Sequence, residues 1–163
     1  FLANGAQPWL IPSMAKLPDI KLRLAKEGDN YQPYARDPET LARTWALPGT
    51  RGLEHRIGGL EKMNLTGTIS YVPENHQVMT DLREEKVARI ANDIPEQEVY
   101  GNPEGGEILV VGWGGTYGHL FSTVKEMRAE GKDISLAHFN YINPLPKNTQ
   151  EIFSRFKRSL YVN

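Results

Sequence analysis

The feature that most constrains the fold is an apolar run, a glycine turn and a helical stretch that follow one another after residue 106. Residues 108–111 (Ile-Leu-Val-Val) are an uninterrupted apolar run, which is typical of a strand buried on both faces of a parallel sheet. The glycine-rich turn 112–115 comes next, and Gly131 stands where a helix C-terminus favours glycine. Between them, the apolar residues that recur at helical spacing are Leu120, Phe121, Val124 and Met127.

The same alternation continues toward residue 163. Ile134, Leu136 and Phe139 mark a second strand, Asn148 caps a second predicted helix, and 160–162 reads as a third strand. The order strand–helix–strand–helix–strand predicts the α/β class, with a three-layer, mostly parallel sheet that carries helices on both faces.

The first two strands of this pattern give the most specific expectation. We expect the strands near 107–112 and 133–139 to be adjacent and parallel, with the helix 116–130 crossing between them in the right-handed sense. Gly114 or Gly115 is expected either to adopt a positive φ or to lie too close to the next helix for a Cβ atom.

Upstream of this pattern the periodicity is weak. Residues 1–80 are rich in proline, glycine and polar side chains, and we interpret them as a linker or extended segment from a preceding domain. A helix is predicted from Asp81, which can act as its cap with Glu84 three residues on, and Pro95 is expected to end it. The α/β core domain is thus predicted to cover 81–163, truncated near its C-terminal end, and Phe1 to lie within a longer polypeptide.

Composition excludes several classes of function. The 163 residues carry a formal net charge of −1, so no basic excess indicates a nucleic-acid partner. There are no cysteines, which excludes disulfides, thiolate metal sites and iron–sulfur ligation by this chain, and fits a cytoplasmic location. No stretch approaches the about 18 apolar residues of a membrane span, so no membrane partner is expected.

The glycine turn is the most conspicuous candidate site. Its residues Gly114, Gly115, Thr116 and Tyr117 lie between a strand and a helix, where backbone N–H groups can bind an anion. Tyr117 stands where a dinucleotide-binding fingerprint requires glycine, and the phosphate-loop ending is missing. A tight packing turn, an interface or anion contact, and a nucleotide site all remain open at this point.

Two other places bring polar side chains together. His55 and Arg56 sit in a loop flanked by glycines, where they can meet a carboxylate or phosphate, or simply form local ion pairs. His138 and Asn140 lie at the carboxyl end of the second predicted strand, the edge where open α/β sheets bind ligands. The structural alternative for this pair is a satisfied, half-buried polar group.

Catalytic and metal-binding patterns are missing from the sequence. The four histidines have no spacing that suits a metal site, so none is predicted. No Gly-x-Ser-x-Gly turn exists, which leaves a hydrolase without a visible nucleophile. We therefore predict no catalytic residue and no cofactor-binding residue in this chain.

Several motifs resemble those of a known family. They occur in the family's order and cover nearly the whole chain, which makes the set specific although each piece alone is weak. The sequence is similar to the alpha subunit of 2-oxoacid:acceptor oxidoreductases, especially the 2-oxoglutarate:ferredoxin type. The stretches that carry the resemblance are Gly52-Leu-Glu-His-Arg-Ile-Gly-Gly59, Pro73-Glu-Asn-His-Gln77, Arg83-Glu-Glu-Lys-Val87, Val110-Val-Gly-Trp-Gly-Gly-Thr-Tyr-Gly118 and Ala137-His-Phe-Asn-Tyr-Ile-Asn-Pro-Leu-Pro-Lys-Asn148.

This resemblance implies a fold like the transketolase C-terminal domain, the family's second core domain. It implies that the whole enzyme uses thiamine diphosphate, magnesium and an iron–sulfur cluster, and that it oxidatively decarboxylates a 2-oxoacid to its acyl-coenzyme A. The implied partners are the preceding domains of the same alpha subunit, the beta subunit, ferredoxin and coenzyme A. The resemblance places the cofactor in a preceding domain and the beta subunit, so this chain is expected to be structural.

The resemblance leaves competing interpretations of the residues open. A free-standing small-ligand or nucleotide-binding module would use the turn 112–118, and a small hydrolase is a third interpretation. If the chain is a core domain, we expect the strand ends and the loops 112–118 and 140–148 to form an interface. Its predicted aromatic anchors are Trp113, Tyr117 and Tyr141.

Overall fold

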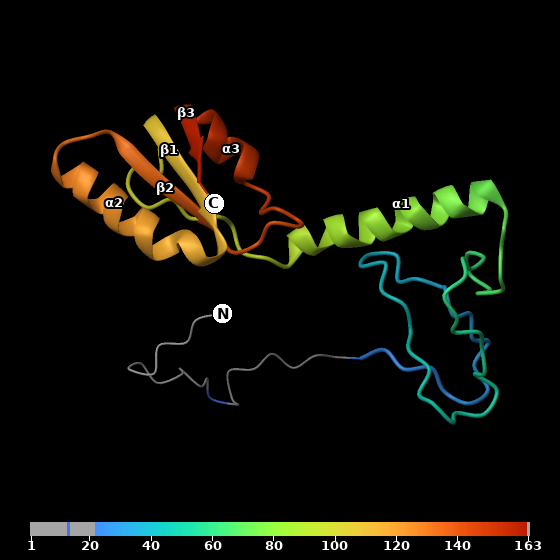
Figure 1. The fold of residues 1–163 in the computed structure, drawn as a ribbon. Coiled ribbons are helices and arrows are strands. Elements are labelled where there is room, and N and C mark those ends of the chain that lie inside the picture. The colour runs from blue at the N-terminus through green and yellow to red at the C-terminus, as the bar shows by residue number, and fades with distance from the viewer. Residues whose placement is uncertain (1–12, 14–21, 163) are drawn as a thin grey trace.

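The chain is described by a computed structural model that covers Ser13 and residues 22–162. A lobe of loops leads into the long helix α1 (Pro73–Arg89), and an α/β domain follows at its other end (Figure 1). The 3₁₀ turn η2 (Ile90–Asn92) closes α1. The domain then contains, in order, β1 (Gly106–Trp113), the 3₁₀ turn η3 (Gly114–Thr116), α2 (Tyr117–Ala129), β2 (Ile134–Phe139), α3 (Thr149–Ser154) and β3 (Phe156–Tyr161).

The three strands form one sheet in the order β2-β1-β3, and both pairs are parallel. Ile108 is opposite Ile134 in the first pair, and Gly106 is opposite Phe156 in the second. The predicted α/β class and the predicted parallel pairing of the first two strands are confirmed.

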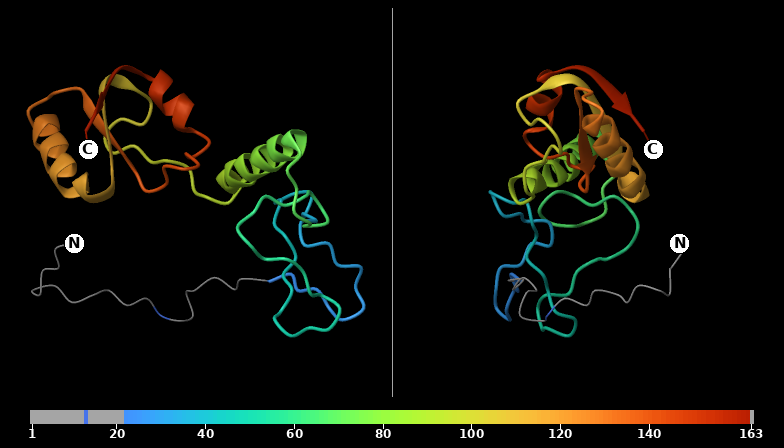
Figure 2. Two further views of the ribbon diagram at one scale, coloured as in Figure 1. Left: turned by 45° about the vertical axis from the view of Figure 1, so that its right-hand side comes forward. Right: turned by 90° about the vertical axis from the view of Figure 1, so that its left-hand side faces the viewer.

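The central strand β1 contributes side chains to two separate cores. Leu109 and Val111 face α3 and pack with Ile152, whereas Val110 faces α2 and packs with Val124. Figure 2 shows the two helices on opposite sides of the sheet. Because both faces of β1 are covered, its apolar run has no polar interruption.

The outer edge of β2 is covered by the segment that follows α1. Tyr100 and Leu136 exchange two backbone hydrogen bonds of 2.8 and 2.9 Å as an antiparallel bridge. The Asn148 amide binds the backbone of Gln97 in the same way, accepting at 2.9 Å and donating at 3.0 Å. These contacts pair a sheet edge that would otherwise expose unsatisfied backbone groups.

The first helix begins earlier than the sequence predicts. The helix α1 begins at Pro73, eight residues before the predicted cap Asp81. Asp81 lies inside the helix and accepts a hydrogen bond from the Gln77 side chain at 2.7 Å. Proline is favoured in the first turn because its missing N–H is not needed there. The helix also ends at Arg89, several residues before Pro95.

The C-terminal elements differ from prediction as well. Asn148 stands at the N-cap of α3 but its side chain makes no capping bond, because the amide is bound to Gln97. The third strand begins at Phe156, four residues before the predicted start at 160. The helix α3 is correspondingly short, with six residues that end at Ser154.

Two glycines at the end of β1 have different structural roles. Gly114 has a φ of 64°, which confirms the predicted left-handed backbone at this turn. A Cβ atom on Gly112 would overlap the Cδ1 atom of Leu120 on α2, so this glycine permits the close approach of helix and sheet.

This close approach predicts the effect of two matched substitutions. Gly112→Ala should lower the free energy of unfolding by about 1–3 kcal/mol, because the added methyl group overpacks the β1–α2 contact. Gly118→Ala, in α2 with open space around the position, should leave stability unchanged or slightly raised. Urea unfolding measures both. If Gly112→Ala costs as much stability in a Leu120→Ala background as in the unaltered chain, the proposed overlap is not the cause.

Candidate functional site

One group of predicted site residues meets at the carboxyl ends of β1 and β2. The chain leaves β1 toward α2 on one face of the sheet and leaves β2 toward α3 on the other face. Because the two loops diverge, a crevice is expected between these strand ends, the usual ligand position in open α/β sheets. Gly114, Gly115, Thr116 and Tyr117 follow β1, and His138 and Asn140 lie at the end of β2.

Tyr117 and His138 are in direct contact at this edge. Their ring centroids are 5.1 Å apart in an edge-on arrangement, and Tyr117 also stacks on Phe121 at 5.5 Å. The Nε2 atom of His138 is buried and has no hydrogen-bond partner within residues 22–162. The Tyr117 ring stays 51% exposed, so it covers the histidine while presenting its own surface to solvent.

The remaining residues of the turn serve its structure. Thr116 donates its hydroxyl proton to the Trp113 carbonyl oxygen at 2.9 Å. Trp113 is half-buried against the core on the α3 side, and Asn140 is exposed. No nucleophile, general base and orienting group come together among these side chains. The turn is packed against the strand ends, and the one unpaired nitrogen beside it is the Nε2 atom of His138.

The second predicted group, His55 and Arg56, lies in the lobe upstream of α1. The His55 Nδ1 atom is 2.8 Å from the Leu53 carbonyl oxygen, and its ring contacts Tyr31 edge-on at 5.3 Å. Both residues line a hollow of about 260 Å³. Arg56 also lines a second hollow, of about 360 Å³, that His55 does not reach.

Lys62 is the residue of this lobe that sequence reasoning missed. Its side chain is buried, at 3% exposure, and lines the larger hollow with Arg56. The Lys62 ammonium donates to the carbonyl oxygens of Gly58 and Leu60 at 2.8 and 2.6 Å. An isolated antiparallel bridge between Lys62 and Ile69 positions the lysine at the hollow. Because a single bridge leaves no periodic pattern in the sequence, it could not be predicted.

The hairpin 61–70 that carries Lys62 is fixed to α1 by polar contacts. Asn75, buried on α1, accepts a hydrogen bond from the Asn64 amide and donates one to the Lys62 carbonyl, each at 2.9 Å. Glu61 contacts His76 at 2.6 Å and Arg83 at 3.4 Å. The hydrogen bond from His76 is the main cause that lowers the pKa of Glu61. The sequence alone gives His76 no role, and in the structure its contact with Glu61 links α1 to the hairpin.

Two classes of site are not seen in the described part of the chain. Residues 22–162 bring no three His, Asp or Glu side chains together in a group that could hold a metal ion. Within the same residues, no helix is both long and apolar enough to cross a membrane.

The parallel order β2-β1-β3, with a helix on each face and a glycine turn after the central strand, defines an α/β domain of the doubly covered, parallel-sheet class. A 2-oxoglutarate:ferredoxin oxidoreductase from Magnetococcus marinus, solved with 2-oxoglutarate, coenzyme A and succinyl-CoA bound, has a similar fold. The TM-score is 0.79 at 22% identity, over 93% of this chain and 27% of that one. This similarity agrees with the predicted transketolase C-terminal-like fold.

Comparisons of sequence give the family. The chain is 46% identical over 157 residues to the 2-oxoglutarate oxidoreductase subunit KorA of Mycobacterium tuberculosis, and 33% identical over 94 residues to the alpha subunit of 2-oxoacid:ferredoxin oxidoreductase 1 of Aeropyrum pernix. The first match covers 96% of this chain and 24% of KorA. The second covers 55% of this chain and 15% of the Aeropyrum pernix subunit. No family model matches the chain. The chain belongs to the alpha-subunit family of the 2-oxoacid:ferredoxin oxidoreductases.

The Glu61 contacts predict a pH dependence of the hairpin. Because the folded pKa of Glu61 is lowered, its stabilisation is complete above the ordinary value of 4.5 and is lost as the pH falls through the lower folded pKa. Hydrogen exchange of the amides of 61–70, corrected for intrinsic rates, should therefore accelerate only at acid pH. Glu61→Gln should remove this acid step, whereas Glu54→Gln, on an exposed glutamate, should keep it. An unchanged acid step in Glu61→Gln would contradict the assignment.

Proposed function

We propose that this chain forms part of the alpha subunit of an enzyme that oxidatively decarboxylates a 2-oxoacid to its acyl-coenzyme A, with ferredoxin as electron acceptor. The observation that carries the proposal is the 46% identity to KorA over 96% of the chain. 2-Oxoglutarate is the proposed substrate, supported by the name of that relative and by the ligands of the Magnetococcus marinus structure. The proposed location is the cytoplasm.

Two features of this chain bear on where the cofactors of such an enzyme are held. Bound thiamine diphosphate supplies the carbanion stabilisation that decarboxylation of a 2-oxoacid requires. The chain has no cysteine thiolate for an iron–sulfur cluster, and residues 22–162 gather no acidic or histidine group of three for magnesium. On the family resemblance, we propose that the thiamine diphosphate, magnesium and cluster sites lie in preceding domains and the beta subunit, and that the role of this chain is structural.

The role proposed for the α/β domain is assembly. Apolar side chains are exposed around the carboxyl edge of the sheet: Tyr117 at 51%, Tyr141 at 44%, Ile142 at 59% and Leu145 at 46%. Large apolar groups gathered in this way mark interaction surfaces. Trp113 packs against the core and is a poorer anchor than its sequence position indicated. The proposed occupants are the preceding domains of the alpha subunit and the beta subunit.

The proposed activity predicts a substrate-dependent electron transfer. The complete alpha subunit, assembled with its beta subunit and supplied with thiamine diphosphate and magnesium, should reduce ferredoxin only when 2-oxoglutarate and coenzyme A are both present. Pyruvate should support a rate at least about tenfold lower, a difference near 1.4 kcal/mol in transition-state binding. Absence of ferredoxin reduction with every 2-oxoacid tested would refute the proposed reaction.

The proposed assembly face predicts a selective defect. Ile142→Asp should weaken association of the alpha and beta subunits by about tenfold or more, because it places a charge in an apolar contact. Val78→Asp, which alters an aliphatic side chain of α1 that is 42% exposed, is the matched control. Analytical ultracentrifugation measures association and thermal unfolding measures fold. Equal association of both variants with the beta subunit would argue against this face.

A further inference from the structure

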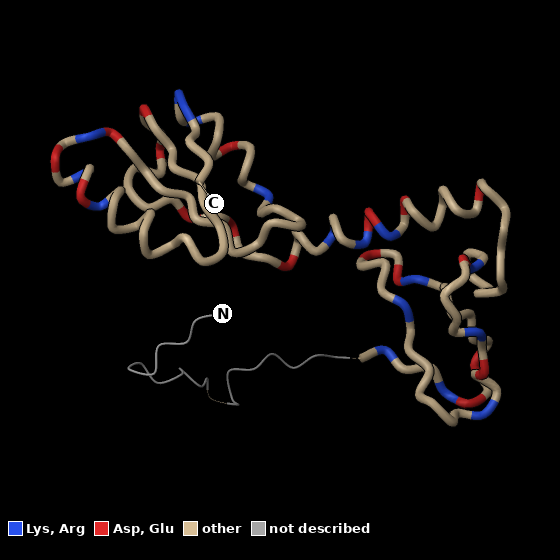
Figure 3. Tube along the Cα trace, viewed as in Figure 1, with Lys and Arg blue, Asp and Glu red and all other residues tan. Residues whose placement is uncertain are grey.

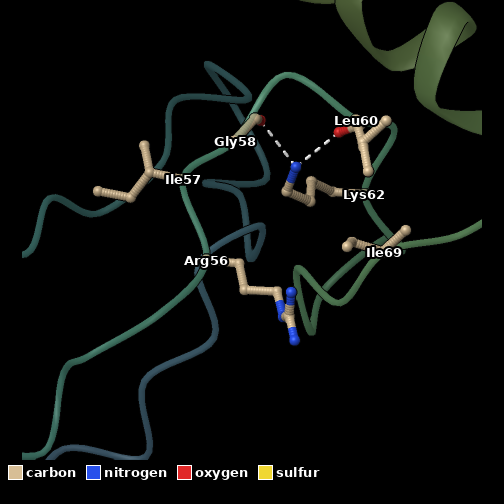
Figure 4. Close-up of a pocket in the computed structure, with 6 residues that line it drawn as sticks. All are labelled: Arg56, Ile57, Gly58, Leu60, Lys62 and Ile69. Carbon is tan, nitrogen blue, oxygen red and sulfur yellow. Dashed lines mark hydrogen bonds between the residues drawn. The ribbon is translucent and has the colours of Figure 1, made fainter.

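A pocket in the lobe upstream of α1 combines two cationic side chains with apolar ones. It has a volume of about 360 Å³ and lies between the 56–60 loop and the hairpin 61–70. Figure 4 shows the Lys62 ammonium directed at the Gly58 and Leu60 carbonyl oxygens, with the Arg56 side chain extending toward the hairpin. The residues that line the pocket are Arg56, Ile57, Gly58, Leu60, Lys62 and Ile69.

The charge of this pocket is not balanced by an ion pair among residues 22–162. No aspartate or glutamate lines it, and neither Lys62 nor Arg56 forms an ion pair with any residue in 22–162. A buried lysine is normally paired with an anion, because removing an ammonium from water is costly. The two carbonyl oxygens occupy two of its three N–H donors, which leaves one for a further acceptor.

Arg56 provides the second unused charge. Its guanidinium makes no hydrogen bond to the described residues and remains exposed at the mouth of the pocket. Guanidinium groups bind carboxylate and phosphate oxygens in a bidentate geometry. Leu60 and Ile69 add aliphatic residues to the lining, which favours a ligand with an apolar portion beside its charge. The Ile57 side chain points away from Lys62 and Ile69 (Figure 4).

We propose that this pocket binds a small oxyanion with a short aliphatic segment, with Arg56 and Lys62 at the charged group and the apolar lining beside the segment. The shared chemistry of the ligand is a carboxylate or phosphate oxygen. The site is separate from the carboxyl edge of the sheet and does not depend on the proposed enzymatic activity.

Chemical protection of Arg56 tests the proposal in the complete protein. Phenylglyoxal modifies accessible arginines, and mass spectrometry gives the rate at each one. Butyrate or butyl phosphate at saturation and constant ionic strength should slow modification of Arg56 by about fivefold or more, and neutral butanol should not. The better of the two anions identifies the charged group. Arg51, exposed and unpaired within residues 22–162, is the internal control and should change by less than about twofold.

Two variants separate binding from loop structure. Lys62→Met should raise the anion concentration needed for protection about tenfold or more, the loss expected for one charge-assisted hydrogen bond. Because Lys62 also holds the loop, Ile69→Ser is a second variant that leaves both cations in place. It should weaken protection by butyl phosphate but not by inorganic phosphate. The proposal is overturned if no anion slows Arg56, or if Arg56 is unreactive from the outset and insensitive to anions, as it would be beneath another protein surface.

Discussion

Burial of β1 on both faces is the constraint on which the α/β domain depends. Leu109 is fully buried on the α3 side and Val110 is 5% exposed on the α2 side, so neither face tolerates a polar group. This double burial requires α2 and α3 to cover opposite faces. The opposite placement makes the loops after β1 and β2 diverge, which brings Tyr117 against His138 at the strand ends. The candidate site at this edge is therefore a consequence of how the core is filled.

The lobe upstream of α1 is stabilised in a different way. Between residues 22 and 72 the structure contains turns and isolated bridges and no named helix or strand, so backbone ladders contribute little. Side-chain polar groups replace them. Arg36 donates to Asn64 at 2.7 Å and to the Tyr34 carbonyl at 2.9 Å, and Asn75 binds the hairpin from α1. Such a network loses several bonds together when one member is removed, which makes α1 the support of the lobe.

Local signals determined what the sequence could predict. The strand 108–111 and the glycine turn were predictable because burial on both faces and a left-handed backbone each leave a distinct residue pattern. The start of α1 was misplaced because Asp81 and Glu84 imitate a capping box, whereas the true start carries a proline and no side-chain cap. The role of Asn148 followed from Gln97, a partner 51 residues away that no local pattern identifies.

Polar side chains that hold the fold together differ from polar groups that have no partner among the described residues. Thr116, Asn75 and Asn148 each direct their side chains to backbone groups, so they hold turns, hairpin and sheet edge together and have little left to offer a ligand. Two unpaired groups stand out among the described residues, the buried His138 Nε2 atom and the exposed Arg56 guanidinium. A buried donor or acceptor without a partner costs about 1–3 kcal/mol, so a fold retains one where another molecule can satisfy it. For His138, this cost supports the proposed assembly face at the strand ends. For the proposed Arg56–Lys62 pocket, the support is the unpaired charge and not the cost of burial.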